Sequence, residues 1–141
     1  MARLLKAQVV WANEVLNTIV VDDSALMREA IAGLLAAAPG CHVVGKGANG
    51  LEGLELVSVY HPDLVILDIN MPVMGGIEAL RVLRMEWPQI HVVMVSSILE
   101  TELREYALGL GAYACVEKGS ELWERLPAIV TELSRKCPDK T

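Results

Sequence analysis

The fold of this 141-residue chain is decided by one stretch, LVILDINMP at residues 64–72. Four consecutive apolar residues lead into a single acid, Asp68, and a Met-Pro turn follows. A continuous apolar run of this length is typical of a strand that is covered on both faces, as in a parallel sheet. Open parallel sheets place their ligands in the crevice beyond the carboxyl ends of their strands. Asp68 is therefore predicted to lie in such a crevice.

The rest of the chain alternates between strand and helix patterns. Besides 64–68, β-branched or apolar runs predict strands at residues 18–21, 42–44, 91–95 and 113–117. Helical spacing of apolar residues predicts helices over 25–38, 51–60, 77–85, 100–110 and 120–134, with Pro127 either restarting or distorting the last one. Five such alternations with short connections predict an α/β fold, a five-stranded parallel sheet that is doubly wound with helices on both faces.

Composition limits the classes of function. Hydrophobic residues make up 53% of the chain, which indicates a packed domain. We predict that residues 17–134 form this domain, between an extension at 1–16 and a polar tail at 135–141. No apolar run approaches the roughly 20 residues that span a bilayer. The formal net charge of −6, without a basic cluster, argues against nucleic-acid binding by this domain.

Cysteine usage and the start of the chain bear on location. Cys41, Cys115 and Cys137 are an odd set without metal-binding spacing, so reduced thiols are expected. The apolar stretch within residues 1–16 is short and broken by polar residues, which does not fit a signal peptide. A cytoplasmic location is the expectation.

Polar side chains stand at the carboxyl ends of four predicted strands. They are Asp22-Asp23, Asp68, Ser96 and Lys118. Because the carboxyl ends of parallel strands meet at one edge of the sheet, we expect these side chains to converge. Each alone has an ordinary explanation as a helix cap, a turn residue or a solvated surface charge. Their joint position on four strand ends favours a shared site.

The chemistry of this set fits the transfer of a phosphoryl group to an aspartate. Three neighbouring carboxylates repel one another unless a proton or a cation relieves them, and hard oxygen ligands favour Mg²⁺. Lys118 can balance the charge of Asp68 and of a phosphate, and a serine hydroxyl can donate a hydrogen bond to that phosphate. An ionised aspartate is an accepted covalent nucleophile, and the transition state chiefly needs positive charge around it. Asp68 is the predicted nucleophile.

Several stretches resemble the receiver domain of bacterial and archaeal response regulators, and the resemblance covers residues 17–134. The matching stretches are VVDDS at 20–24, LDINMPVMGG at 67–76, VMVSS at 93–97 and EK at 117–118. The first three are most similar to the receiver half of chemotaxis methylesterases, although these 141 residues hold no counterpart of the esterase domain. The resemblance implies the flavodoxin-like strand order 2-1-3-4-5, which chemotaxis receivers share.

The resemblance also implies a role for each site residue. Asp68 would accept the phosphoryl group from a phosphohistidine, on a sensor histidine kinase or a phosphotransfer protein. Ser96 and Lys118 would hold this group and change position when it arrives, and the small Ser97 would leave room for it. The implied ligands of Mg²⁺ are Asp22, Asp23, Asp68 and the backbone carbonyl of Asn70.

Two positions depart from the family pattern. The family usually has an aromatic switch residue three positions before the lysine, where this chain has Cys115. Tyr113 lies two residues earlier, on the same face of the predicted strand. Either Tyr113 takes over the switch role or the serine–aromatic coupling is weakened, so Ser96, Tyr113 and Cys115 are the switch candidates. Gly119 stands where a proline is usual, so a rigid, often cis, turn is not expected.

Two other functions compete with this interpretation. Gly45 to Gly50 fit the G-x-G-x-x-G pattern of dinucleotide-binding folds, with acids about 20 residues on. This alternative leaves the strand-end residues unexplained, and a glycine-permissive loop before an Asn-capped helix accounts for the pattern equally well. The other alternative is a receiver-like binding module that is never phosphorylated. By analogy, a homodimer through residues 99–134 is a further expectation. No residue pattern identifies the kinase, the downstream target or an effector domain.

Overall fold

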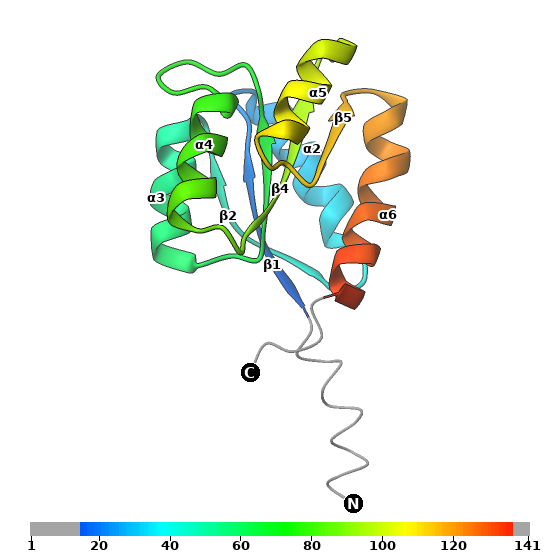
Figure 1. Ribbon diagram of the computed structural model, residues 1–141. Helices are drawn as coiled ribbons and strands as arrows, with labels where there is room; N and C mark the ends of the chain where they lie inside the picture. The colour runs from blue at the N-terminus through cyan, green and yellow to red at the C-terminus, as the bar shows by residue number, and fades with distance from the viewer. Residues whose placement is uncertain (1–14, 137–141) are drawn as a thin grey trace, which may run out of the picture.

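A five-stranded parallel sheet with helices on both faces makes up the computed structural model, which describes residues 15–136 (Figure 1). The strand order is β2-β1-β3-β4-β5, so the predicted doubly wound α/β fold is confirmed. The elements are β1 (Leu16–Val21), α2 (Ala25–Ala36), β2 (Cys41–Gly47), α3 (Gly50–Tyr60), β3 (Leu64–Asp68), α4 (Gly76–Glu86), β4 (His91–Ser96), α5 (Thr101–Gly109), β5 (Ala114–Glu117) and α6 (Ser120–Lys136).

Each face of the sheet carries its own hydrophobic core. One core joins side chains such as Ile19 and Leu67 to helices α3, α4 and α5. The other joins Val20 and Ile66 to helices α2 and α6, which lie together on the opposite side in Figure 1. Adjacent strand residues therefore point into opposite cores, as the two-residue period of a strand requires. Burial on both faces is the reason that β3 is apolar at every position before Asp68.

Strand β2 is longer than the sequence pattern predicts. It continues to Gly47, because its ladder with β1 runs on through Val20↔Lys46 and Val21↔Gly47 after a register shift. Pairing with a neighbouring strand outweighs the low strand propensity of glycine here. Half of the predicted loop at 45–50 is therefore strand, and only residues 48 and 49 separate β2 from α3.

Helix α6 runs without a break through Pro127, so the helix does not restart there. An interior proline costs roughly 3 kcal/mol because it removes a hydrogen bond and crowds the preceding turn. The apolar face of α6 outweighs this cost, since burying one large aliphatic side chain contributes about 1.5–3 kcal/mol. Its buried members are Leu122, Leu126, Ile129, Val130 and Leu133.

The ends of the domain differ slightly from the predicted bounds. β1 begins at Leu16, which is fully buried although the sequence places it in the predicted extension, and α6 continues to Lys136 rather than ending at residue 134. The rest of the predicted extension and tail, residues 1–14 and 137–141, lies outside the described part of the chain. Among the described helices, none has the length and apolar character to cross a membrane.

Candidate functional site

Three aspartates meet at the carboxyl edge of the sheet, the upper edge in Figure 1. Asp68 is the last residue of β3, and Asp22 and Asp23 directly follow β1, the strand that pairs with it. One carboxylate oxygen from each of the three lies within 4.8 Å of the others. Asp22 is 0% exposed and Asp68 is 3% exposed, whereas Asp23 is open to solvent. The predicted convergence of the three acids is confirmed, and their oxygens are spaced closely enough to hold one cation.

Lys118 supplies the positive charge of the site. It directly follows β5, and its backbone N–H donates to the carbonyl of Ser96 at 2.8 Å. Its Nζ lies 2.8 Å from Asp22 Oδ2 and 3.5 Å from Asp68 Oδ2. The sequence predicts a pairing with Asp68, but Asp22 is the closer partner. An ammonium group with two acids in reach can leave one for the other without losing its charge partner.

Asp22 is held from three further directions. Its Oδ1 accepts the backbone N–H of Ser24 at 2.9 Å, and its own N–H donates to Gly47 at 3.0 Å. Its backbone carbonyl accepts a hydrogen bond of 2.7 Å from Arg28, which comes from the first turn of α2. Sequence reasoning missed Arg28, and its only sequence signal is its position one helical turn after the Ser24 cap. These contacts hold Asp22, the nearer ion-pair partner of Lys118, in place.

The charges around Asp68 change its affinity for a proton. Burial and, to a lesser extent, the negative charges of Asp22 and Asp23 raise the pKa of Asp68 from 3.8 to about 6, although Lys118 opposes the rise. Burial alone would lower the pKa of Lys118, but its contacts with Asp22 and Asp68 outweigh that effect and raise it. Lys118 therefore stays charged at neutral pH, while Asp68 ionises at a pH closer to neutral than an ordinary aspartate does.

Ser96 and Asn70 lie at the same carboxyl edge of the sheet. Ser96 ends β4 and is fully buried, and its hydroxyl donates to the carbonyl of Ile98 at 2.8 Å. Asn70 is exposed in the loop between β3 and α4, two residues after Asp68. The hydroxyl must leave Ile98 before it can donate to a phosphate, so this role of Ser96 and the metal-binding role of the Asn70 carbonyl stay predictions.

The two candidates for an aromatic-type switch face opposite sides of the sheet. Cys115 packs into the core under α3, α4 and α5, whereas Tyr113 packs against the core under α2 and α6. The prediction that they share a face is wrong, because Tyr113 precedes the first residue of β5 and the strand period does not reach it. The Tyr113 hydroxyl is hydrogen-bonded to Glu132 at 2.5 Å, and its ring lies edge-on to His91. The structure thus places Tyr113 at the end of β5 remote from Lys118.

A polar network that sequence reasoning missed surrounds Cys115. Its backbone carbonyl accepts hydrogen bonds from Arg104 on α5 (2.6 Å) and Arg125 on α6 (3.2 Å). Both arginines also bind the carboxylate of Glu121, which accepts the backbone N–H of Glu117 at 2.8 Å as well. Burial acts to raise the pKa of Glu121, but these hydrogen bonds outweigh it and lower the pKa to about 2. The network joins α5, β5 and α6 beside the lysine.

Replacing Glu121 with glutamine should therefore destabilise the protein. The lowered pKa means that the ionised carboxylate contributes stability above its unfolded pKa near 4.5, and that this contribution is lost as the pH falls toward 2. We expect Glu121→Gln to lower the free energy of unfolding by about 1–3 kcal/mol at pH 7 and by much less at pH 3. Urea unfolding at the two pH values measures this, and an equal loss at both would contradict it. Glu124→Gln, on the exposed side of α6, is the matched control.

The glycine-rich stretch has structural partners of its own. Gly45 and Gly47 lie in β2, and Gly50 begins α3. The N–H groups that a bound pyrophosphate would need already donate hydrogen bonds within the protein. The N–H of Glu52 donates to Asn49 Oδ1, the N–H of residue 48 donates to Glu52 Oε1, and the N–H of Gly50 donates to the carbonyl of Met74. The stretch therefore gives no support to the dinucleotide-binding alternative.

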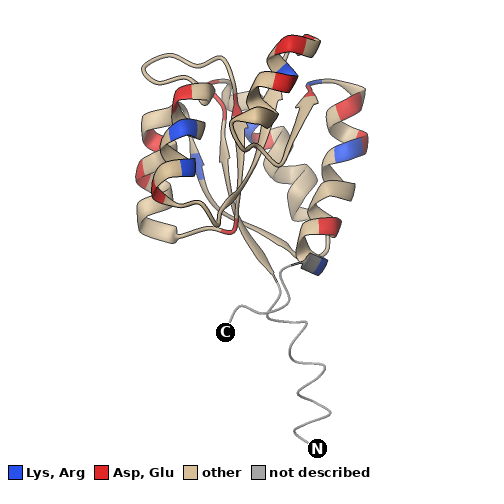
Figure 2. Cartoon of the chain, in the orientation of Figure 1, with Lys and Arg blue, Asp and Glu red and all other residues tan. Residues whose placement is uncertain are grey.

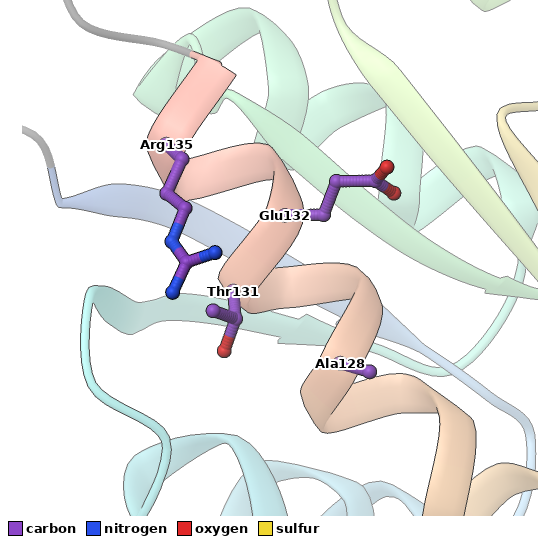
Figure 3. Close-up of a pocket in the computed structure, with 4 residues that line it drawn as sticks. All are labelled: Ala128, Thr131, Glu132 and Arg135. Carbon is purple, nitrogen blue, oxygen red and sulfur yellow. The ribbon is translucent and has the colours of Figure 1, made fainter.

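No other described feature competes with this edge as a site. A pocket lies on the C-terminal half of α6, lined by Ala128, Thr131, Glu132 and Arg135 (Figure 3). One acid and one base on a single helix do not form a convergent polar constellation. Helices α2, α4, α5 and α6 each carry both acidic and basic residues, whereas α3 carries only the acids Glu52 and Glu55 (Figure 2).

Comparison with known proteins identifies the family. The family described as "Response regulator receiver domain" matches residues 18–130. Protein-glutamate methylesterase/protein-glutamine glutaminase 1 of Methanosarcina acetivorans is 41% identical over 99 residues, 69% of this chain and 28% of that protein. The corresponding protein of Oleidesulfovibrio alaskensis is 45% identical over 105 residues, 73% of this chain and 28% of that protein. The chain thus spans less than a third of the length of these two relatives.

Solved structures agree with the sequence relatives. The response regulator domain of Thermotoga maritima CheB is 33% identical, with a TM-score of 0.75 over 88% of this chain and 96% of that one. A LuxR-family response regulator from Aurantimonas is 29% identical, with a TM-score of 0.78 over 86% of each chain. The strand order, the acidic edge and the match over residues 18–130 all indicate the same family. The chain belongs to the receiver-domain family of two-component response regulators.

Proposed function

We propose that this receiver is a Mg²⁺-dependent phosphoacceptor in which Asp68 is the nucleophile. The observation that carries the proposal is the position of Asp68, a nearly buried carboxylate beside two other acids and within 3.5 Å of Lys118. Such a group is costly to keep ionised, and a bound metal ion would stabilise it by placing positive charge beside it. Receiver domains as a family bind Mg²⁺ at an acidic pocket of this kind.

The donor in this proposal is a phosphohistidine. A carboxylate oxygen of Asp68 attacks the phosphorus, so that a P–O bond forms while the P–N bond breaks and the imidazole leaves with the electron pair. Lys118 moves its charge from Asp22 toward the phosphoryl oxygens, and Ser96 turns its hydroxyl from Ile98 to donate to one of them. Water later cleaves the acyl phosphate and restores the carboxylate.

The carboxylates of Asp22, Asp23 and Asp68, with the carbonyl of Asn70, would hold Mg²⁺. When bound, the metal stabilises the negative charge that spreads over the phosphoryl oxygens in the transition state. The spacing of the three acids fits a single hard cation, and Asp23 keeps the site open to solvent, as an ion that retains several waters requires.

The family and the exposed apolar side chains near the acidic edge both indicate which partners the domain has. Receiver domains act with histidine kinases or phosphotransfer proteins and with effector domains. Three exposed apolar side chains, Leu26, Val73 and Ile98, follow the carboxyl ends of β1, β3 and β4 around the acids. They support a protein donor, because burying such side chains stabilises a docked complex. Because its relatives are methylesterases, we propose a methylesterase as the effector. A dimer through residues 99–134 stays a prediction.

A phosphorylation experiment tests the proposal directly. The purified chain is incubated with acetyl phosphate and Mg²⁺, and its intact mass is measured. We expect a gain of one phosphoryl group, which is lost when EDTA replaces the metal and when hydroxylamine cleaves the acyl phosphate. No gain with either acetyl phosphate or a phosphorylated histidine kinase would instead support the receiver-like module that is never phosphorylated.

The pKa of Asp68 predicts how phosphorylation depends on pH. Only the ionised carboxylate is nucleophilic, and burial together with the neighbouring acids places its pKa at about 6 in the absence of metal. When Mg²⁺ is limiting, we expect the rate with acetyl phosphate to rise with pH through a midpoint near 6. Saturating Mg²⁺ favours the ionised form, so the midpoint should then move to lower pH. Initial rates across pH 5–8 at two Mg²⁺ concentrations check this prediction. A pH midpoint that is the same at both concentrations would contradict it.

A further inference from the structure

Gly50 lies directly against the loop between β3 and α4, which begins at Asp68. Its backbone N–H donates to the carbonyl oxygen of Met74 at 2.8 Å. A Cβ atom at position 50 would lie 2.6 Å from that oxygen and 2.8 Å from Met74 Cγ. Only glycine permits this approach, so the backbone at the start of α3 lies directly against the C-terminal part of the loop.

The loop adopts a strained conformation beside this contact. Val73 has a φ of +68°, in the left-handed region that a β-branched residue rarely enters. Its side chain is 77% exposed, so packing of the valine itself does not hold it there. Such a conformation is unfavourable and persists only where the surroundings impose it. The hydrogen bond between Gly50 and the neighbouring Met74 is one such constraint.

The other end of the loop is fixed to the site. The N–H of Gly76 donates to the carbonyl of Ile69 at 2.8 Å. A Cβ at position 76 would collide with the carbonyl oxygen of Asp68, so α4 begins in backbone contact with the nucleophile's own residue. With both ends held, a displacement at Met74 is transmitted to the segment between Asp68 and Met74, which contains Asn70.

We propose that Gly50 is a positioning residue, whose contact with Met74 holds the β3–α4 loop in the strained form that the metal site requires. The inference rests on the proposed function, because it concerns the affinity of the acidic edge for Mg²⁺. It also gives the glycine-rich stretch a role: its last glycine serves the loop that follows Asp68 and binds no nucleotide. Gly50 acts through the loop and touches neither the metal nor the phosphoryl group.

A double-mutant cycle tests this coupling. The variants are Gly50→Ala, Val73→Gly and their combination, and the matched control is Gly33→Ala, on the exposed side of α2 with no atom within 4 Å of the added Cβ. The Kd for Mg²⁺ is measured calorimetrically on the full chain without a phosphodonor. Glycine adopts the left-handed conformation without strain, so at position 73 it lets the loop absorb the displacement that the added methyl group at position 50 causes.

We expect Gly50→Ala to weaken Mg²⁺ binding at least about tenfold, as loss of a group that orients metal ligands commonly does. The combination should recover most of that loss, and Gly33→Ala should bind like the wild type. Phosphorylation of Gly50→Ala should need more Mg²⁺ but reach the wild-type rate at saturation, whereas a general folding defect would lower the rate at every concentration. Wild-type affinity in Gly50→Ala, or strictly additive losses in the combination, would overturn the proposal.

A measurement on the wild type decides the matter if Gly50→Ala does not fold. The Gly50 amide should be protected from hydrogen exchange in the metal-free protein, and more strongly protected when Mg²⁺ is added. Protection that Mg²⁺ leaves unchanged would overturn the proposed role of Gly50. A wild-type chain that binds no Mg²⁺ and takes up no phosphoryl group would instead count against the proposed function.

Discussion

Replacing Asp68 with asparagine is expected to abolish the uptake of a phosphoryl group from acetyl phosphate. The amide keeps the size of the carboxylate but has no nucleophilic oxygen anion with which to attack phosphorus. Asp63, at the opposite end of β3, provides the control Asp63→Asn, which should still gain the mass of one phosphoryl group. Equal labelling of Asp68→Asn and the wild type would remove Asp68 from its proposed role.

The same substitution should stabilise the metal-free protein at neutral and alkaline pH. Because the pKa of Asp68 is raised in the folded state, its protonated form is favoured there. Relative to an ordinary aspartate, its contribution to stability is fully present below pH 3.8 and is lost as the pH rises through about 6. Asparagine mimics the protonated form at every pH. In EDTA, Asp68→Asn should therefore have a higher Tm than the wild type at pH 8 and a similar one at pH 4.

Replacing Lys118 with methionine is expected to change stability, metal binding and phosphorylation in different directions. Without the ammonium group, the buried charges of Asp22 and Asp68 lose their partner, which should cost the metal-free protein about 3 kcal/mol. Mg²⁺ then replaces the missing positive charge, so its binding should tighten and the rise in Tm on adding Mg²⁺ should exceed that of the wild type. Phosphorylation should be slower at saturating metal, because the phosphoryl oxygens lose a counter-charge.

A double variant separates charge from packing in this prediction. Asp22→Asn with Lys118→Met removes both members of the 2.8 Å ion pair, so most of the stability lost in the single variant should return in EDTA. Thermal unfolding with and without Mg²⁺ is the measurement. A Mg²⁺-induced shift in Lys118→Met no larger than that of the wild type would show that the lysine does not neutralise these acids.

The parts of the fold that could be predicted from sequence are those with local signals. Alternating runs of β-branched and helical patterns give the five strands and five helices, and polar residues directly after strands give the acidic edge. The strand order itself required the family resemblance, because parallel strands pair with neighbours that are distant in the chain. The end of β2 at Gly47 could not be predicted for the same reason: pairing with β1, not local propensity, sets it.

The missed features of the site depend on contacts between distant residues. Arg28 and Arg104 bind backbone carbonyls, which leave no mark on the sequence near either residue. The preference of Lys118 for Asp22 over Asp68 depends on how far β5 places the side chain across the sheet. The wrong pairing of Tyr113 with Cys115 arose from extending the strand period one residue beyond the start of the strand.

The proline inside α6 leaves this last helix one backbone hydrogen bond short. Pro127 has no N–H to donate to the carbonyl four residues before it, so the turns on either side are connected by one fewer hydrogen bond. The turns before it carry Glu121, which is tied to β5, and the buried Leu126, and the turns after it are seated in the same core through Leu133. Side-chain packing on both sides of the proline therefore keeps the two halves of α6 in line where the backbone bond is missing.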